Sequence, residues 1–240
     1  MELWDVNCFV GRWPSADLLF HDVPGLLARM DQLGIGRAAV SHADCLTYDP
    51  VWGNAQLMNL LAQAGVDLSQ PDTIAPALAD VGSVSRLVMT SILRDKNPVR
   101  EYKIAEAIEL TTMKLVGYVE TIHALLDRLS GDSSVVLFGG RAKDRPYPGS
   151  TTVTAVNGGV SSLINTLATE LAPIRFNAIH PGITGDSPEW RDKPLDHVLA
   201  RTPTKRLVTM ADVVDATVFL LENPAMNGEN LYVDGGWMLM

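Results

Sequence analysis

Residues 133–140 read SSVVLFGG and open the stretch that decides the fold of this chain. This apolar run predicts a buried strand, because it is rich in β-branched residues and ends at two glycines. A loop rich in proline and glycine follows, and residues 151–173 (TTVTAVNGGVSSLINTLATELAP) predict a helix. A second strand over residues 175–180 ends at Pro181-Gly182. Strand, helix and strand in this order predict a parallel βαβ unit.

The same alternation extends outward in both directions. The predicted strands are residues 3–10, 37–41, 66–68, 84–90, 133–140, 175–180 and 230–234, and the predicted helices are residues 23–33, 54–64, 71–80, 103–129, 151–172 and 211–222. A polar segment with prolines, residues 184–205, separates the last two units. The expected fold class is α/β: a Rossmann-like, doubly wound, mostly parallel seven-stranded sheet with helices on both faces. No linker interrupts the pattern, so we expect a single Rossmann-like domain over residues 1–240, with residues 1–65 as an atypical N-terminal portion.

Net charge and composition limit the kinds of partner and the cellular location that we expect for this protein. A net charge of -9 and a sequence pI near 4.9 disfavour nucleic acid, because an acidic surface repels phosphates. The apolar runs are shorter than the ~20 residues that cross a bilayer. The first residues, MELWDVN, lack the basic flank and apolar core of a signal peptide. Cys8 and Cys45 do not have the spacing of metal ligands and are predicted to be reduced thiols. We therefore expect no membrane partner and a cytoplasmic location.

Residues 66–240 resemble the short-chain dehydrogenase/reductase (SDR) family. The resemblance is carried by Asp212-Val213, Gly228 and residues 231–236 (LYVDGG) near the end, and by residues 175–182 (RFNAIHPG), which match a strand and turn beside the nicotinamide. It implies NAD or NADP as the cofactor. It also implies a set of cofactor-binding residues: Asp67, Leu68, Thr90, Pro181, Gly182, Ile183 and Thr184.

The mechanism of that family needs a serine, a tyrosine and a lysine four residues after the tyrosine. On a helix, this spacing puts the phenol and the ammonium on one face, where the positive charge lowers the pKa of the phenol. In this chain the serine position is Gly140, the tyrosine position is Val153 and the lysine position is Asn157. None of the three can transfer a proton as its counterpart does.

Two other side chains are candidates for the missing chemistry. Lys114 aligns with an asparagine that the family keeps on the preceding long helix, and it could supply the positive charge missing at Asn157, with desolvation lowering its pKa. The alternative is a lysine on a helix flank with its charged end in water. Tyr147, six residues before Val153, could replace the phenol or could simply cover the sheet edge as an aromatic residue of a turn. The predicted catalytic residues are therefore Lys114, Tyr147 and Asn157.

The first 65 residues follow a different pattern. The family begins with a glycine-rich loop that holds a pyrophosphate, whereas residues 11–17 (GRWPSAD) contain one glycine. Residues 1–60 resemble the start of the amidohydrolase family, in residues 5–7 (DVN) and Asp49-Pro50. That family holds a catalytic metal with a His-x-His pair, and its counterpart here is Asp5-Val6-Asn7. No later array of His and Asp completes such a site, so we expect no metal.

Three functions follow from these patterns. The favoured one is an atypical SDR-like, NAD(P)(H)-dependent oxidoreductase that acts on a small carbonyl or alcohol substrate. The alternative is a non-redox SDR-like binding or scaffold protein, a pseudoenzyme without the serine, tyrosine and lysine. A remote alternative is an amidohydrolase-type metal hydrolase.

The resemblance also implies a homodimer or homotetramer. In the family, the helices corresponding to residues 103–129 and 151–172 pair across a two-fold axis, and Gly158-Gly159 would serve either this interface or packing inside one subunit. The apolar residues 236–240 (GWMLM) are expected to dock on a neighbouring subunit.

Overall fold

The computed structural model describes residues 3–10, 35–42, 66–93 and 96–240. The chain divides into two units, residues 1–65 with 187–193 and residues 66–186 with 194–240. In the first unit, β1 (Leu3–Val10) and β2 (Ile35–His42) pair in parallel. These strands confirm the predictions for residues 3–10 and 37–41. The predicted helices 23–33 and 54–64 and the loop 11–17 lie outside the described residues.

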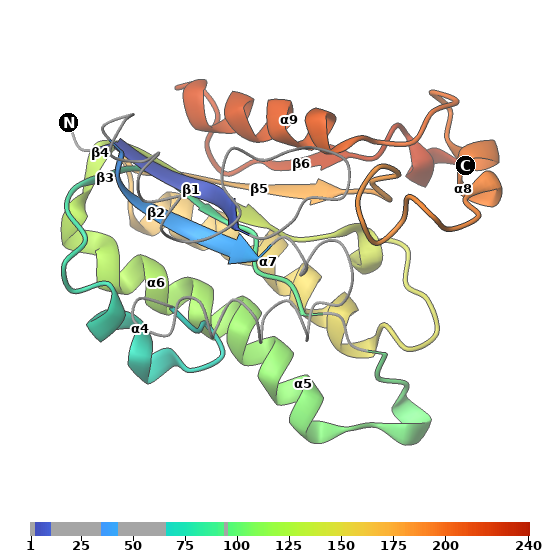
Figure 1. Cartoon of the computed structure of the whole chain (residues 1–240), viewed down its shortest axis with the longest axis horizontal. Coiled ribbons are helices and arrows are strands. Elements are labelled where there is room, and N and C mark those ends of the chain that lie inside the picture. Colours follow the sequence, from blue (N-terminus) through green and yellow to red (C-terminus); the bar gives the residue numbers. More distant parts are fainter. Residues whose placement is uncertain (1–2, 11–34, 43–65, 94–95) are drawn as a thin grey trace. The chain divides into compact units, whose positions relative to one another are not determined.

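The second unit is built on a four-stranded parallel sheet with the order β3-β4-β5-β6 (Figure 1). Its strands are β3 (Val84–Met89), β4 (Leu129–Phe138), β5 (Arg175–Pro181) and β6 (Asn230–Val233). Residues 133–137 of β4 are buried one after another, as expected for a strand covered on both faces. This parallel sheet confirms the α/β, Rossmann-like fold class.

Helices cover both faces of this sheet. Helix α9 (Met210–Glu222) packs against β4, β5 and β6, and α7 (Thr151–Glu170) packs against β5 from the opposite face (Figure 1). The core under α9 centres on Val136, Ile179 and Leu220, which are fully buried. The other helices of the unit are α4 (Pro71–Ala77), α5 (Ile104–Thr111), α6 (Gly117–Leu125) and α8 (Asp196–Arg201). Helix α8 lies inside segment 184–205, for which the sequence predicted no helix.

Both ends of α9 are fixed by side chains. At its start, Thr209 and Asp212 form a reciprocal capping box, in which each side chain accepts a hydrogen bond from the backbone N–H of the other residue. Near its end, the guanidinium of Arg175 on β5 donates to the carbonyl oxygens of Leu220 and Leu221. These carbonyls belong to the last turn of the helix and have no partner inside it. Arg175 therefore ties the end of α9 to the start of β5.

The predicted strand at residues 66–68 is wrong, since these residues form a turn that leads into α4. The carboxylate of Asp67 accepts hydrogen bonds from the backbone N–H of Ser69 at 2.9 Å and from its hydroxyl at 2.7 Å. This local bonding competes with strand formation, as is usual for aspartate. Six of the seven predicted strands are thus found, four of them in the sheet of the second unit.

The predicted long helix over residues 103–129 is interrupted. A π-helical turn, Thr112–Val116, separates α5 from α6, and a 3-10 turn, Leu126–Arg128, follows α6. Such π-helical turns often occur at functional sites. In the described ranges, no helix is long and apolar enough to cross a membrane.

Glycines of the second unit differ in whether their neighbours leave space for a Cβ atom. A Cβ atom added to Gly159 would lie 2.9 Å from a methyl group of Leu115, so this glycine serves packing inside one subunit. A Cβ atom added to Gly117 would lie 2.4 Å from the carbonyl oxygen of Leu68, whereas one added to Gly158 would have no neighbour within 4 Å.

We therefore predict opposite effects of two Gly→Ala substitutions. Gly117→Ala should lower the free energy of unfolding by about 1–3 kcal/mol, because the clash is with the backbone of the 66–70 turn. Gly158→Ala should raise it by up to about 1 kcal/mol, because alanine is the better helix former. Urea unfolding of both variants measures this difference, and equal stability of the two would contradict it.

Candidate functional site

The carboxyl ends of the four strands gather the residues that the sequence singled out. Met89 pairs with Leu137, Phe138 with Ile179, and Pro181 with Val233, so the residues that follow β3, β4, β5 and β6 lie along one edge of the sheet. In open parallel sheets, this edge is where ligands bind. The candidate site is therefore built from Thr90, the 139–140 glycines, the segment after Pro181, and the facing side chains of α7.

A buried histidine fixes the end of β4. His180 on β5 is fully buried, and its Nδ1 accepts a hydrogen bond of 3.1 Å from the backbone N–H of Gly140. Its Nε2 lies 2.8 Å from Oδ1 of Asn230 on β6. A backbone N–H can only donate, so Nδ1 carries no hydrogen and Nε2–H donates to Asn230. A Cβ atom on Gly139 would lie 2.4 Å from this ring, which explains the glycine.

His180 is neutral at physiological pH. Burial lowers the pKa of this histidine to about 4, and the hydrogen bond to Asn230 only partly offsets the effect. A second proton at Nδ1 would also face the N–H of Gly140. His180 is therefore a positioning residue that the sequence patterns did not predict. The only signal was the pair of glycines at the end of the preceding strand.

The structure brings together two of the three positions at which the sequence resemblance placed the family's acid/base residues. Asn157 on α7 is buried, and its Nδ2 lies 2.8 Å from the point where a Cβ atom on Gly140 would be. A serine at position 140 would therefore require the amide of Asn157 to shift. Val153 lies one turn earlier on α7 and is half-buried. The side chains here are uncharged and include no phenol.

Lys114 is buried at the carboxyl end of β3. It lies in the π-helical turn, and its Nζ donates to the carbonyl oxygen of Ser91 at 2.5 Å and to the Tyr118 hydroxyl at 3.0 Å. Tyr118 in turn donates to the carbonyl oxygen of Met89. Burial lowers the pKa of Lys114 to about 7 and raises the pKa of Tyr118. The side chain thus points toward the sheet, and it does not extend into water from the helix flank.

Tyr147 lies in the loop before α7. Its side chain is half-exposed, and its backbone N–H donates to the hydroxyl of Ser150 at 3.0 Å. The same hydroxyl lies 2.9 Å from that of Thr154 in the first turn of α7. This local bonding fixes the course of the loop as it reaches the helix.

The predicted adenine side of a cofactor site lies around the 66–70 turn and the end of β3. The carboxylate of Asp67 is already bonded to Ser69, and the carbonyl of Leu68 packs against Gly117. Thr90 follows β3 directly and is exposed. Of these residues, Thr90 is the one whose side chain is open at the edge of the sheet.

The predicted nicotinamide side follows β5. The backbone N–H of Gly182 donates to the carbonyl oxygen of Val233, and a Cβ atom on Gly182 would lie 2.9 Å from Cβ of Asp234. Ile183 is half-buried, and Thr184 pairs with Val208 in an isolated parallel bridge. The turn that begins at Pro181 is thus held between the end of β6 and the loop before α9.

A cationic cluster that sequence reasoning missed lies just after Gly140. Nε of Arg141 is 2.9 Å from Oδ2 of Asp234, and its guanidinium lies 4.0 Å from the ring of Tyr232. Nζ of Lys143 donates to the Tyr232 hydroxyl at 2.9 Å and pairs with Asp144. The signal was the run GRAKDR at residues 140–145 in an otherwise acidic chain. The cluster ties the loop after β4 to β6.

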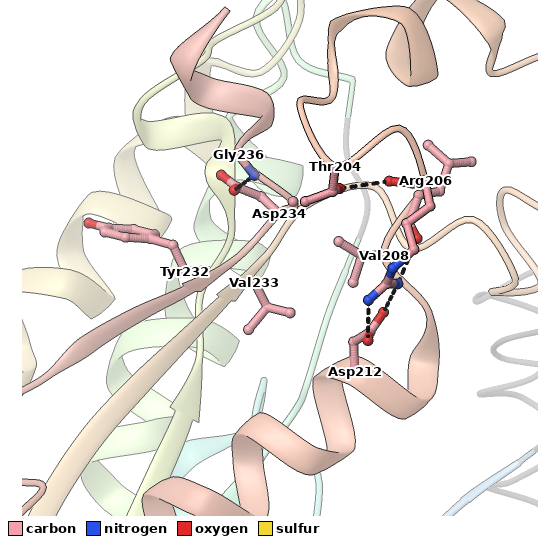
Figure 2. A pocket seen from close by; sticks show the side chains of 10 residues that line it. Thr204, Arg206, Val208, Asp212, Tyr232, Val233, Asp234 and Gly236 are labelled. Atoms are coloured by element: carbon pink, nitrogen blue, oxygen red, sulfur yellow. Dashed lines mark hydrogen bonds and ion pairs between the residues drawn. The ribbon is translucent and has the colours of Figure 1, made fainter.

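A separate cavity of about 350 Å³ lies between the loop 204–208, the start of α9 and the end of β6 (Figure 2). Figure 2 shows the guanidinium of Arg206 turned toward the carboxylate of Asp212. Its Nη1 and Nη2 donate to this carboxylate at 2.6 and 2.9 Å. Asp212 also caps α9, so this ion pair is part of the helix cap. None of the predicted site residues lines this cavity. Within the described ranges, no group of three His, Cys, Asp or Glu residues could hold a metal ion.

The burial of Lys114 predicts how the free energy of unfolding should depend on pH. Its pKa is about 7 in the folded chain and 10.5 for an ordinary lysine, so between these values the unfolded chain binds more protons. Stability should then rise with pH, by about 1.4 kcal/mol per unit at most. Relative to a Lys114→Met variant, the wild type should gain stability from pH 7 to pH 10. Urea unfolding of both proteins from pH 7 to pH 10 tests this prediction. Free energies of unfolding that change with pH in the same way in both proteins would contradict it.

Comparison with known proteins agrees with this architecture. Residues 64–238 match the model of the family described as Enoyl-(Acyl carrier protein) reductase. The 2-(R)-hydroxypropyl-CoM dehydrogenase of Xanthobacter autotrophicus is 33% identical over 148 residues, which are 58% of this chain and 58% of that protein. The 3-oxoacyl-(acyl-carrier-protein) reductase of Homo sapiens is 30% identical over 165 residues, which are 67% of this chain and 69% of that protein.

A solved structure, a small-chain dehydrogenase in complex with NADPH, shares the fold with a TM-score of 0.69 and 21% identity over 98% of this chain and 100% of that one. The matched segments span 58%, 44% and 56% of the first three curated relatives, which is about half of their length. The match over residues 64–238 exceeds half of the chain. The chain therefore belongs to the short-chain dehydrogenase/reductase family, because residues 64–238 match the family model described as Enoyl-(Acyl carrier protein) reductase.

Proposed function

We propose that this protein is an NAD(P)(H)-dependent oxidoreductase that acts on a small, uncharged carbonyl or alcohol substrate at the carboxyl ends of β3, β4 and β5. The observation that carries the proposal is the arrangement of Thr90, Gly140 and Gly182 along one edge of a parallel sheet in a chain of this family. The relatives named above are dehydrogenases and reductases.

The described residues fit a dinucleotide at this edge. Gly182 lets the turn after β5 pack closely against Asp234 at the end of β6, and Thr90 offers an exposed hydroxyl after β3. Ile183 and Thr184 continue from this turn and would flank the nicotinamide, while Asp67 and Leu68 would lie near the adenine. When bound, the cofactor supplies or accepts a hydride. The chain's own residues must then orient the substrate oxygen and move a proton.

Lys114 is the group that we propose for the proton. Its pKa of about 7 means that both protonation states are populated at physiological pH, which is the condition for general acid/base work. Its Nζ lies at the carbonyl oxygen of Ser91, one residue past Thr90. Asn157 would hold the substrate oxygen by a neutral hydrogen bond, and Tyr147 would contribute its phenol from the loop before α7.

A second function is favoured by a specific observation. Gly140, Val153 and Asn157 supply neither phenol nor ammonium, and Asn157 occupies the space that a serine at position 140 would need. These changes fit a non-redox binding or scaffold protein that retains the fold and the cleft. Measurements of cofactor binding and of turnover distinguish the oxidoreductase from the non-redox binding or scaffold protein.

The proposal predicts saturable binding of NADPH or NADH, measured by calorimetry. Reduction of a panel of small aldehydes and ketones should fall by about a hundredfold in Lys114→Met, since a positioned acid/base group contributes about that much. Lys114→Met should still bind cofactor. Binding without turnover in the wild type would support the non-redox function. No saturable binding at millimolar cofactor would defeat the oxidoreductase.

We also propose that the protein is a homodimer or homotetramer in a cytoplasmic setting. Four apolar side chains along α5, the π-helical turn and α6 are exposed in a single subunit: Ile104, Ile108, Val116 and Val119. Leu239 and Met240 are exposed as well, next to Trp237, whose ring lies under Arg145. Exposed apolar side chains on these helices and at the C-terminus are candidates for a subunit interface.

Light scattering should give the mass of a dimer or tetramer for the wild type. Ile108→Asp should convert it to monomers, because a carboxylate buried in an apolar interface is costly. The unfolding temperature of that variant serves as the check on folding. A monomeric wild type would contradict the proposed assembly.

A further inference from the structure

In the part of the chain that the structure describes, the ammonium of Lys114 is bonded to one side chain, the phenol of Tyr118. Nζ donates to the Tyr118 hydroxyl at 3.0 Å and lies 5.1 Å from the centre of the same ring. The second partner of Nζ is the carbonyl oxygen of Ser91, at 2.5 Å. Tyr118 is fully buried, so water does not compete for its hydroxyl. The position of Nζ therefore depends on this phenol.

The backbone on either side of Thr90 fixes the direction of the Tyr118 hydroxyl. The hydroxyl lies 2.9 Å from the carbonyl oxygen of Met89, the last residue of β3, and 3.3 Å from that of Ser91. A carbonyl oxygen can only accept, so the phenol donates its one hydrogen to this backbone and accepts from Lys114 with a lone pair. A phenylalanine in place of Tyr118 would keep the ring and lose these bonds.

The course of the helix brings the two side chains together. Lys114 lies in the π-helical turn and Tyr118 in the first turn of α6, and a spacing of four residues puts side chains on one face of a helix. Helix α6 begins at Gly117, whose missing side chain lets the helix lie against the carbonyl oxygen of Leu68. The buried face of this helix therefore carries both the ammonium and the phenol.

A phenol suits a lysine that changes its protonation state. The ammonium has three hydrogens and no lone pair, so it needs acceptors, and the Tyr118 oxygen is one of them. When Lys114 has lost a proton, Nζ has a lone pair, and the same hydroxyl can turn from the carbonyl of Met89 and donate to it. The bond to the ammonium is the stronger one, because it is charge-assisted. Tyr118 thus favours the protonated form and opposes the effect of burial, which lowers the pKa of Lys114.

Other titratable groups around the π-helical turn are not bonded to Nζ of Lys114. Helices α4, α5, α6 and α7 pack against this turn, and β3 ends beside it. The ion pairs on these elements lie near the surface: Lys103–Glu106, Glu120–His123 and Arg86–Glu222. The remaining carboxylates of these helices are exposed: Asp72, Glu109 and Glu170. Among the described residues, Tyr118 is thus the titratable group in contact with Lys114.

We propose that Tyr118 is the positioning residue of Lys114: its hydroxyl holds Nζ at the carboxyl end of β3 and stays bonded to it in both protonation states. This inference rests on the proposed function, because it concerns the proton that Lys114 would move. It extends that function by naming a residue that acts through Lys114 and not on the substrate itself.

The test measures the titration of Lys114 in the full-length protein by NMR. Lysine labelled with ¹³C and ¹⁵N reports the pKa through the chemical shifts of Cε and Nζ, and the signals of Lys114 are identified by their absence from Lys114→Met. Tyr118→Phe should weaken proton binding by Lys114 about tenfold, because the ammonium loses an acceptor.

A second measurement does not depend on the folding of Tyr118→Phe. In wild-type protein with ¹³C-labelled tyrosine, the Cζ signal of Tyr118 should shift with pH at the same midpoint as Lys114. In Lys114→Met this signal should not change between pH 5 and pH 10, because burial raises the pKa of the phenol itself above this range.

Tyr232→Phe is the matched control for the pKa of Lys114. The hydroxyl of Tyr232 also accepts a hydrogen bond from a lysine, Lys143, at 2.9 Å, but this tyrosine is on β6 and is 45% exposed. Its removal should leave the pKa of Lys114 as in the wild type. The proposal fails if Tyr118→Phe leaves this pKa unchanged, if Tyr232→Phe lowers it equally, or if the Tyr118 signal does not follow Lys114.

The pH dependence of turnover is a separate measurement. In Tyr118→Phe, the part of the pH–rate profile that depends on Lys114 should move to lower pH by about one pH unit. A wild type without turnover, in which Tyr118→Phe still shifts the titration of Lys114, would overturn the proposed oxidoreductase and leave the coupling of the two residues standing. An active wild type in which Tyr118→Phe leaves the titration of Lys114 unchanged would overturn this inference alone.

Discussion

The hydrogen bond from the backbone N–H of Gly140 to Nδ1 of His180 fixes the end of β4 against β5, and the candidate site depends on it. The same imidazole bonds to Asn230 on β6, whose amide donates to the carbonyl of Ser161 on α7. One neutral ring thus links the ends of three strands and, through Asn230, helix α7. The arrangement requires the neutral tautomer and a glycine at position 139.

This constraint explains why the altered residues of the cleft belong together. The ring excludes a side chain at Gly139, and Asn157 excludes one at Gly140. A serine at position 140 would require the amide of Asn157 to shift, so the conformations of these two residues are coupled. The one group nearby with a pKa near neutrality is the buried Lys114, which belongs to a different helix from Asn157.

Sequence patterns predicted the fold well, because continuous apolar runs and strand-helix alternation depend on local composition. Strands β3 to β6 and helices α7 and α9 lie within a few residues of their predicted bounds. The turn at residues 66–68 was missed because the carboxylate of Asp67 bonds to Ser69, and this outweighs the apolar pattern of Val66 and Leu68. The site was harder to predict from the sequence, because His180 and Gly140 are 40 residues apart and only the register of β4 and β5 brings them together. Lys114 was singled out by alignment, but its burial depends on the π-helical turn, for which no sequence pattern was apparent.

The network around His180 also has a consequence for the order in which the chain folds. Its bonds join residues separated by 40, 50 and 69 positions, and none of them can form within a local segment. Closing such long loops lowers the conformational entropy of the chain before the contacts that compensate for this loss have formed, and this slows folding. Helices α7 and α9 can begin to form from local interactions, whereas the edge of the sheet that forms the cleft requires β4, β5 and β6 in register. We therefore expect this edge of the sheet to be among the last parts of the second unit to acquire its native structure.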